Sequence, residues 1–204
     1  RHGKKIGEDK HGKDGTVSII TDKKAAKLIA QDYQNEKLVT KTNPKTTIQT
    51  TKIVLEEALH TLKRTENNGG LREECSIVTA KGEVIRGGMG DLPDTKNKIP
   101  TAVATLPLLA KNENKQKATS IHSHPLKIQI DNRVFFPQAG HPSFSIDLWT
   151  FPKYGTNIIV GNIRQPYKNT TTVVPLKGIA IYKKGRGDKP VLVLHKKTVE
   201  KILK

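Results

Sequence analysis

The feature that most constrains the fold of this chain is an abrupt change of hydrophobic period at Asn68-Gly69-Gly70. Upstream of it, apolar residues recur at the spacing of one helix face, at Ile48, Val54, Leu55, Ala58, Leu59 and Leu62. We expect a long helix that opens at Asn43-Pro44 and ends at the Asn-Gly-Gly stop, because glycine readily adopts the left-handed conformation that closes a helix. Downstream, the period shortens toward two, which is typical of strands.

The segments after residue 70 are predicted to be mainly strands. They lie at 75–80, 83–86, 118–123, 127–130, 133–136, 157–163, 178–183 and 190–195. Asp131-Asn132 is a good two-residue hairpin turn between two of them. Short helices are expected from Ser145 to about Pro152 and at 198–203. This order predicts an α+β (mixed α/β) fold, in which the first short helix carries Asp147.

Two segments precede this region. Residues 1–15 are basic and Gly-rich with one large apolar residue, Ile6, so we expect a flexible basic lead-in. Residues 16–21 are β-branched and strand-like, and Asp22 is placed to cap a helix that runs to about Glu36. We therefore divide the chain into a lead-in (1–15), a strand-helix extension (16–43) and a main domain (44–204), and expect it to be a piece of a longer protein.

Composition narrows the classes of protein. The chain carries 36 Lys and Arg against 19 Asp and Glu, a net charge of +17, which favours anionic partners without choosing among them. No apolar run approaches the roughly 20 residues that a membrane-spanning helix needs, so membrane insertion is not expected. A single cysteine, Cys75, excludes an internal disulfide framework and a Cys-cluster zinc site.

Three separated features have the chemistry of a metal-dependent hydrolase. His122 and His124 are two apart on a predicted strand, so both imidazoles project from one face. Asp147 is predicted in the first turn of a short helix, where exposed N–H groups favour a carboxylate. Two His and one carboxylate are an accepted set of catalytic zinc ligands. Glu73 and Glu74 follow the helix stop, and a carboxylate there is a candidate general base toward a metal-activated water.

Taken singly, each feature also has a plain structural interpretation. A His-x-His pair is commonly two surface histidines or two core histidines with hydrogen-bond partners. An Asp near the start of a helix is commonly a cap. Adjacent glutamates before a strand commonly face solvent.

Together, the features resemble the JAMM (JAB/MPN-type) zinc metallopeptidase family. The resemblance rests on His122-Ser123-His124-Pro125, on Asp147 after Pro142-Ser143, and on an upstream Glu before a strand. It covers roughly residues 44–204 and implies a JAB/MPN-like fold, in which the long helix packs on a mixed β-sheet and a short helix carries Asp147. It implies that His122, His124 and Asp147 bind Zn²⁺, and that a metal-activated water attacks an amide of a protein or peptide substrate. Glu73 is implied as the general base, because the family's Glu commonly precedes a small residue by three positions, here Ser76; Glu74 is the alternative.

The sequence departs from the family pattern in two places. Residues 125–146 separate His124 from Asp147, about twice the usual gap, and the predicted hairpin at 127–136 accounts for the excess by returning the chain near its start. The family's serine, three residues before the Asp, is Phe144 here. Ser143 and Ser145 flank that position, so one of them is a candidate to hold the oxyanion.

The basic chain also resembles the JAB-like toxin domains at the C-termini of bacterial polymorphic (RHS-type) toxins. That resemblance implies delivery by a bacterial secretion system, action inside a target cell during interbacterial competition, and an immunity protein, for which an acidic surface would suit the +17 charge. Two alternatives stay open: a basic nuclease or nucleic-acid-binding toxin, weakened by few aromatics and no recognisable binding module, and a metal-free MPN-like scaffold for protein contacts.

Overall fold

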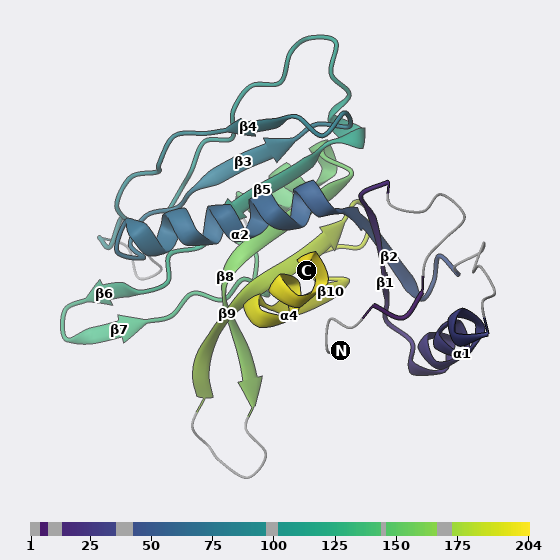
Figure 1. The fold of residues 1–204 in the computed structure, drawn as a ribbon. Coiled ribbons are helices and arrows are strands. Elements are labelled where there is room, and N and C mark those ends of the chain that lie inside the picture. Colours follow the sequence, from purple (N-terminus) through teal and green to yellow (C-terminus); the bar gives the residue numbers. More distant parts are fainter. Residues whose placement is uncertain (1–4, 8–13, 36–42, 97–101, 144–145, 167–172) are drawn as a thin grey trace.

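The computed structural model describes residues 5–7, 14–35, 43–96, 102–143, 146–166 and 173–204 (Figure 1). Within these ranges the protein is mixed α+β, as predicted. The elements in chain order are β1 (Thr16–Ile20), α1 (Lys23–Gln34), β2 (Thr47–Thr51), α2 (Lys52–Asn67), β3 (Cys75–Val78), β4 (Val84–Arg86), β5 (Thr119–Ser123), β6 (Ile128–Ile130), β7 (Arg133–Phe135), α3 (Asp147–Thr150), β8 (Thr156–Pro166), β9 (Val173–Lys183), β10 (Leu192–His195) and α4 (Lys196–Leu203). Most of the predicted lead-in lies outside the described residues.

A six-stranded mixed sheet forms the centre of the molecule. Its strand order is β10-β9-β8-β5-β3-β4, in which β5 and β8 are parallel and the other neighbours are antiparallel. Helix α2 lies along β3, β5 and β8, and α4 lies over β9 and β10 on the same side (Figure 1). The opposite face of the sheet is free of these two helices, and the candidate site forms there.

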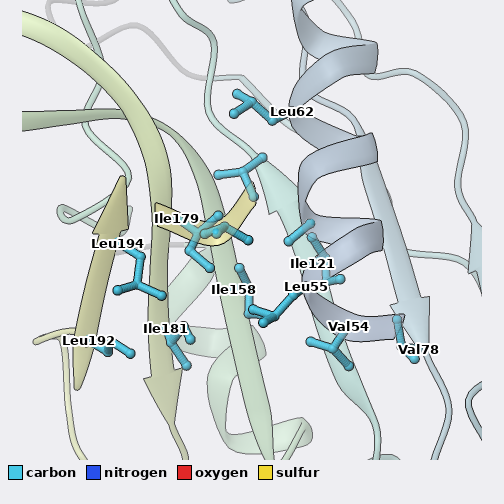
Figure 2. Close-up of a cluster of buried hydrophobic side chains, with 13 residues drawn as sticks. Val54, Leu55, Leu62, Val78, Ile121, Ile158, Ile179, Ile181, Leu192 and Leu194 are labelled. Atoms are coloured by element: carbon cyan, nitrogen blue, oxygen red, sulfur yellow. The ribbon is translucent and has the colours of Figure 1, made fainter. Parts of the chain in front are cut away.

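The main core fills the space between α2 and the sheet (Figure 2). Leu55 and Leu62 of α2 meet Ile121 of β5, Ile158 of β8 and Ile179 of β9, and all five side chains are fully buried. Burial of each such side chain is worth about 1.5–3 kcal/mol. The helical spacing in the sequence therefore identified the face of α2 that packs on the sheet.

The predicted start of this helix is wrong. Helix α2 begins at Lys52, and the Thr51 hydroxyl caps it by accepting the Val54 N–H at 3.3 Å. Ile48 lies in β2, opposite Ile19 of β1. The β-branched run at 46–51 takes extended backbone because β1 offers it a partner, so pairing with a distant segment overrides the helical spacing. The predicted boundary at 43/44 falls between these two paired strands.

The shorter predicted elements largely match the structure. Asp22 caps α1 by accepting the Ala25 N–H at 2.8 Å. Strands β6 and β7 form the expected hairpin, whose turn holds Asp131 at a φ of 51°. The short helix α3 begins at Asp147 rather than at Ser145, which lies outside the described residues. Strands β8 and β9 are longer than predicted because they pair with each other along their whole length. Among the described helices, none combines the length and apolarity needed to cross a membrane.

Candidate metal centre

Strand β5 delivers two imidazoles to the face of the sheet that α2 does not cover. His122 lies opposite Cys75 of β3, while its neighbours Ile121 and Ser123 point toward α2. His124 follows directly after the strand, where its N–H donates to the Val160 carbonyl at 2.9 Å. Both histidines are buried, and their ring centroids lie 5.5 Å apart. The alternation expected of a strand therefore brings the pair together as predicted.

Asp147 meets both rings from the first turn of α3. Its Oδ1 lies 3.0 Å from His122 Nε2, and its Oδ2 lies 3.2 Å from His124 Nε2. Ser143 fixes the carboxylate in two ways: its N–H donates to Oδ2 at 2.6 Å, and its hydroxyl accepts the Asp147 N–H at 3.0 Å. The two histidines and Asp147 form a buried group whose ligand atoms all lie within 4.8 Å of one another. Residues 23 positions apart in the chain are thus brought to one point.

The hydrogen-bond partner of His124 indicates where one hydrogen of this group lies. His124 Nδ1 lies 3.1 Å from the Gln138 carbonyl, which only accepts, so Nδ1 must carry a hydrogen. In the neutral ring, Nε2 then presents a lone pair to the carboxylate of Asp147. His122 Nε2 is buried and has no hydrogen-bond partner among the described residues, although Asp147 Oδ1 lies near it. Either a proton or a cation is required between these atoms and the carboxylate.

The spacing of the three donor atoms suits a small tetrahedral cation. With bonds of about 2.0 Å from zinc to nitrogen or oxygen, neighbouring ligand atoms of a tetrahedron lie about 3.3 Å apart. The two nitrogen-to-oxygen distances of 3.0 and 3.2 Å are close to that edge. The Gln138 carbonyl on Nδ1 is the kind of outer contact that orients a metal-binding imidazole. These residues therefore fit a divalent metal ion, whose identity the geometry does not choose.

The two adjacent glutamates point in opposite directions. Glu73 interacts electrostatically with His124 and Asp147, and its Oε2 accepts the Ala104 N–H at 3.1 Å. Glu74 lies on the α2 side, where its Oε1 accepts a hydrogen bond from Asn68 at 3.1 Å and its Oε2 lies 3.8 Å from Arg64 Nε. The structure thus brings Glu73, and not Glu74, to the side of the candidate metal ligands.

Burial and charge set these carboxylates apart. Loss of solvent raises the pKa of Glu73 to about 8; the attraction of His124 lowers it, and the repulsion of Asp147 adds to the rise. Burial would also raise the pKa of Asp147, but attraction to His122 and the contacts of both rings outweigh it and hold that pKa well below its usual range. Two buried carboxylates in one site therefore differ in charge near neutral pH, as acid–base chemistry needs.

The remaining sequence candidates have simpler roles. Ser143 is half-buried just before α3 and binds the carboxylate and the N–H of Asp147, whereas Ser145 and Phe144 lie outside the described residues. Burial raises the pKa of Cys75 to about 11, and its thiol donates to the Thr105 carbonyl at 3.1 Å, so it stays protonated. Trp149 is 73% exposed, because α3 is a single turn and presents this side to solvent.

Two contacts of the site escaped the sequence reasoning. The Gln138 carbonyl holds His124, and the Ala104 N–H holds Glu73. Both are backbone groups, which side-chain types do not reveal. The only available signal was the hairpin at 127–136, which returns the chain toward His124.

Comparison with family models, with curated proteins and with solved structures finds no match to this chain.

Proposed function

We propose that this protein is a zinc-dependent peptidase or isopeptidase of the JAMM type. The observation that carries the proposal is the buried set of His122, His124 and Asp147, which pairs with no lysine or arginine among the described residues and has the carboxyl of Glu73 beside it. A structural cluster of this kind would be expected to contain its own cation. Zinc is preferred because two imidazoles and one carboxylate, with a further open position, are a catalytic zinc set.

His122, His124 and Asp147 would hold the metal, and Ser143 and Gln138 would orient two of these ligands. A bound zinc ion supplies Lewis-acid chemistry, since it polarises a carbonyl oxygen and lowers the pKa of water. Glu73 would bind the attacking water, accept its proton and pass it to the leaving nitrogen. For that task the carboxyl must be ionised, and a neighbouring cation lowers a carboxyl pKa. The pKa of about 8 is a property of the protein without that cation.

The serine role has unequal support at the two candidate positions. Ser143 Oγ already accepts the Asp147 N–H, which leaves its own proton free to donate. It is therefore a candidate to hold the developing oxyanion while it supports Asp147. Ser145 stays a prediction.

We also propose that the chain acts as a toxin domain delivered by a bacterial secretion system. The support is the family resemblance and the net charge of +17, which suits an acidic immunity protein. The rate of association with such a protein should fall as ionic strength rises. An association rate independent of salt would contradict the electrostatic part of this proposal.

The first experiment is a metal titration of the purified chain. We expect one zinc ion per chain by elemental analysis, and none in the double variant His122→Ala/His124→Ala. The exposed His141 provides a matched control, and His141→Ala should retain the metal. Equal zinc in the wild type and the double variant would refute the site.

The second experiment separates the base from its neighbour. Glu73→Gln and Glu74→Gln remove equally buried carboxylates from adjacent positions on opposite faces. With zinc bound, cleavage of a degenerate peptide library and of an isopeptide-linked substrate should be lost in Glu73→Gln and retained in Glu74→Gln. A reduction of about 10²–10⁴-fold is expected for loss of a general base. Full activity of Glu73→Gln would overturn the mechanism, and degradation of nucleic acid by the wild type would favour the nuclease alternative.

A further inference from the structure

A single buried carboxamide closes the long segment that separates His124 from Asp147. Asn162 of β8 is 3% exposed, and its Nδ2 donates to the Leu126 carbonyl at 2.8 Å and to the Pro137 carbonyl at 3.2 Å. Leu126 precedes the β6–β7 hairpin and Pro137 follows it. Since a carboxamide nitrogen carries two hydrogens, Asn162 uses both of them to join the two limbs of this insertion.

The residues that follow Pro137 lie next to His124. Gln138, the next residue, forms an isolated parallel bridge with Asn162, and the Ala139 N–H donates to the Asn162 carbonyl at 2.8 Å. The Gln138 carbonyl then accepts the Nδ1 hydrogen of His124. Tyr182 strengthens the same segment, because its hydroxyl donates to the Ala139 carbonyl at 2.8 Å. The acceptor for His124 therefore lies one residue after the point where Asn162 joins Leu126 to Pro137.

We propose that Asn162 is a positioning residue for His124. By holding Leu126 and Pro137 together, it places the Gln138 carbonyl on Nδ1 and so directs the Nε2 lone pair of His124 toward the metal position. Without the two donors, two part-buried carbonyls lose their partner, which favours separation of the two limbs of the insertion. The inference rests on the metal site of the proposed function but does not require that the site cleave amides.

The test uses NMR of ¹⁵N-histidine protein freed of metal, together with zinc affinity by chelator competition. In the wild type, His124 Nδ1 should carry a hydrogen that exchanges slowly with water, whether the ring is neutral or charged. Asn162→Leu has a similar side-chain volume and no donors. In this variant the Nδ1 hydrogen should exchange rapidly, and zinc affinity should fall by roughly 10–100-fold, the usual effect of losing an outer contact to a metal ligand.

Asn68→Leu is the matched control. The Asn68 carboxamide also donates twice, to the Arg72 carbonyl and to Glu74, but on the α2 side of the sheet. It should leave both the Nδ1 exchange and the zinc affinity unchanged. If Asn162→Leu does not fold, Asn162→Ser serves instead, because its hydroxyl has one hydrogen and cannot join both limbs.

Three results would overturn the inference. The first is a wild-type His124 with no hydrogen on Nδ1. The second is a folded Asn162 variant that keeps both slow exchange and full zinc affinity. The third is an equal loss in Asn68→Leu, which would indicate a general effect of destabilisation. Loss of peptidase activity with these two readouts intact would instead concern the proposed function alone.

Discussion

Two clusters of buried polar side chains lie on opposite faces of the sheet at β3 and β5, and they differ in composition. On the α2 side, Glu57 is bound by Arg86 at 2.9 Å and by the Ser76 hydroxyl at 2.6 Å, and Arg64 lies between Glu57 and Glu74. One atom there, Arg64 Nε, has no hydrogen bond, but it lies 3.8 Å from a Glu74 oxygen. On the other side, the cluster consists of two histidines and two carboxylates. Among the described residues, no lysine or arginine pairs with Glu73 or Asp147.

The comparison distinguishes carboxylates that are paired within the fold from carboxylates that are available to bind a ligand. Each carboxylate on the α2 side faces a guanidinium, so the burial cost is offset within the fold. The opposite side holds a carboxyl whose pKa is raised to about 8 and a histidine nitrogen without a hydrogen bond. Buried groups left in that state lower stability unless something binds them. We interpret the second cluster as a site and the first as part of the framework.

The largest expected effect is the pH dependence of Glu73 in the metal-free protein. Its folded pKa of about 8 exceeds the ordinary 4.5, so between these values the folded chain keeps a proton that the unfolded chain has lost. Stability should therefore fall as pH rises from about 4.5 to 8, by roughly 3–5 kcal/mol in total. Glu73→Gln should remove this dependence. Urea unfolding at pH 5 and pH 9 measures the change in unfolding free energy. An equal change in the wild type and in Glu73→Gln would contradict the raised pKa.

The α2-side cluster should respond in the opposite sense. Glu57→Gln leaves Arg64 and Arg86 without their buried partner and should cost about 3 kcal/mol at pH 7. The half-exposed Arg86 can turn to solvent, which keeps the loss at the low end. Because neighbouring arginines lower the pKa of Glu57, this contribution is present above pH 4.5 and is lost as pH falls. Zinc content should stay at the wild-type level; loss of metal here would mean that the two clusters are coupled.

Zinc should stabilise only through the second cluster. At 100 times its Kd, the ion should raise the unfolding free energy of the wild type by about 2.7 kcal/mol. In Glu57→Gln, zinc should raise the unfolding free energy by the same amount, although this variant is less stable without zinc. In the double variant His122→Ala/His124→Ala, zinc should not change the unfolding free energy. Thermal unfolding with and without zinc makes the comparison. A zinc-induced gain in the double variant would place the metal elsewhere.

The smallest expected effect tests the support of Asp147. Ser143→Ala removes the hydroxyl that accepts the Asp147 N–H and should cost about 1 kcal/mol, the usual net value of one hydrogen bond. Because the backbone N–H of residue 143 still binds Oδ2, zinc should remain bound. A fall in hydrolysis well beyond this change in stability would support the oxyanion role of the hydroxyl, whereas unchanged hydrolysis would leave Ser143 as a cap only.

Local patterns explain which elements were predictable. The α2 face, the Asp22 cap and the Asp131-Asn132 turn each depend on residues a few positions apart, and all three are present. The predicted start of α2 near Pro44 was wrong because β1, more than twenty residues upstream, pairs with residues 47–51. The single turn of α3 offered no such pattern, since four residues have no spacing from which to infer a buried side.

What the sequence alone determined is the chemistry of the candidate ligands: a His pair two apart at the end of a strand and an Asp at a helix start. Both are local arrangements, set by backbone geometry over a few residues. Tertiary structure decided the rest. It turned Glu73 toward the histidines and Glu74 toward Arg64, and it placed the Gln138 carbonyl under His124 through Asn162. These choices depend on contacts between segments distant in the chain, because sheet pairing decides which face each side chain takes.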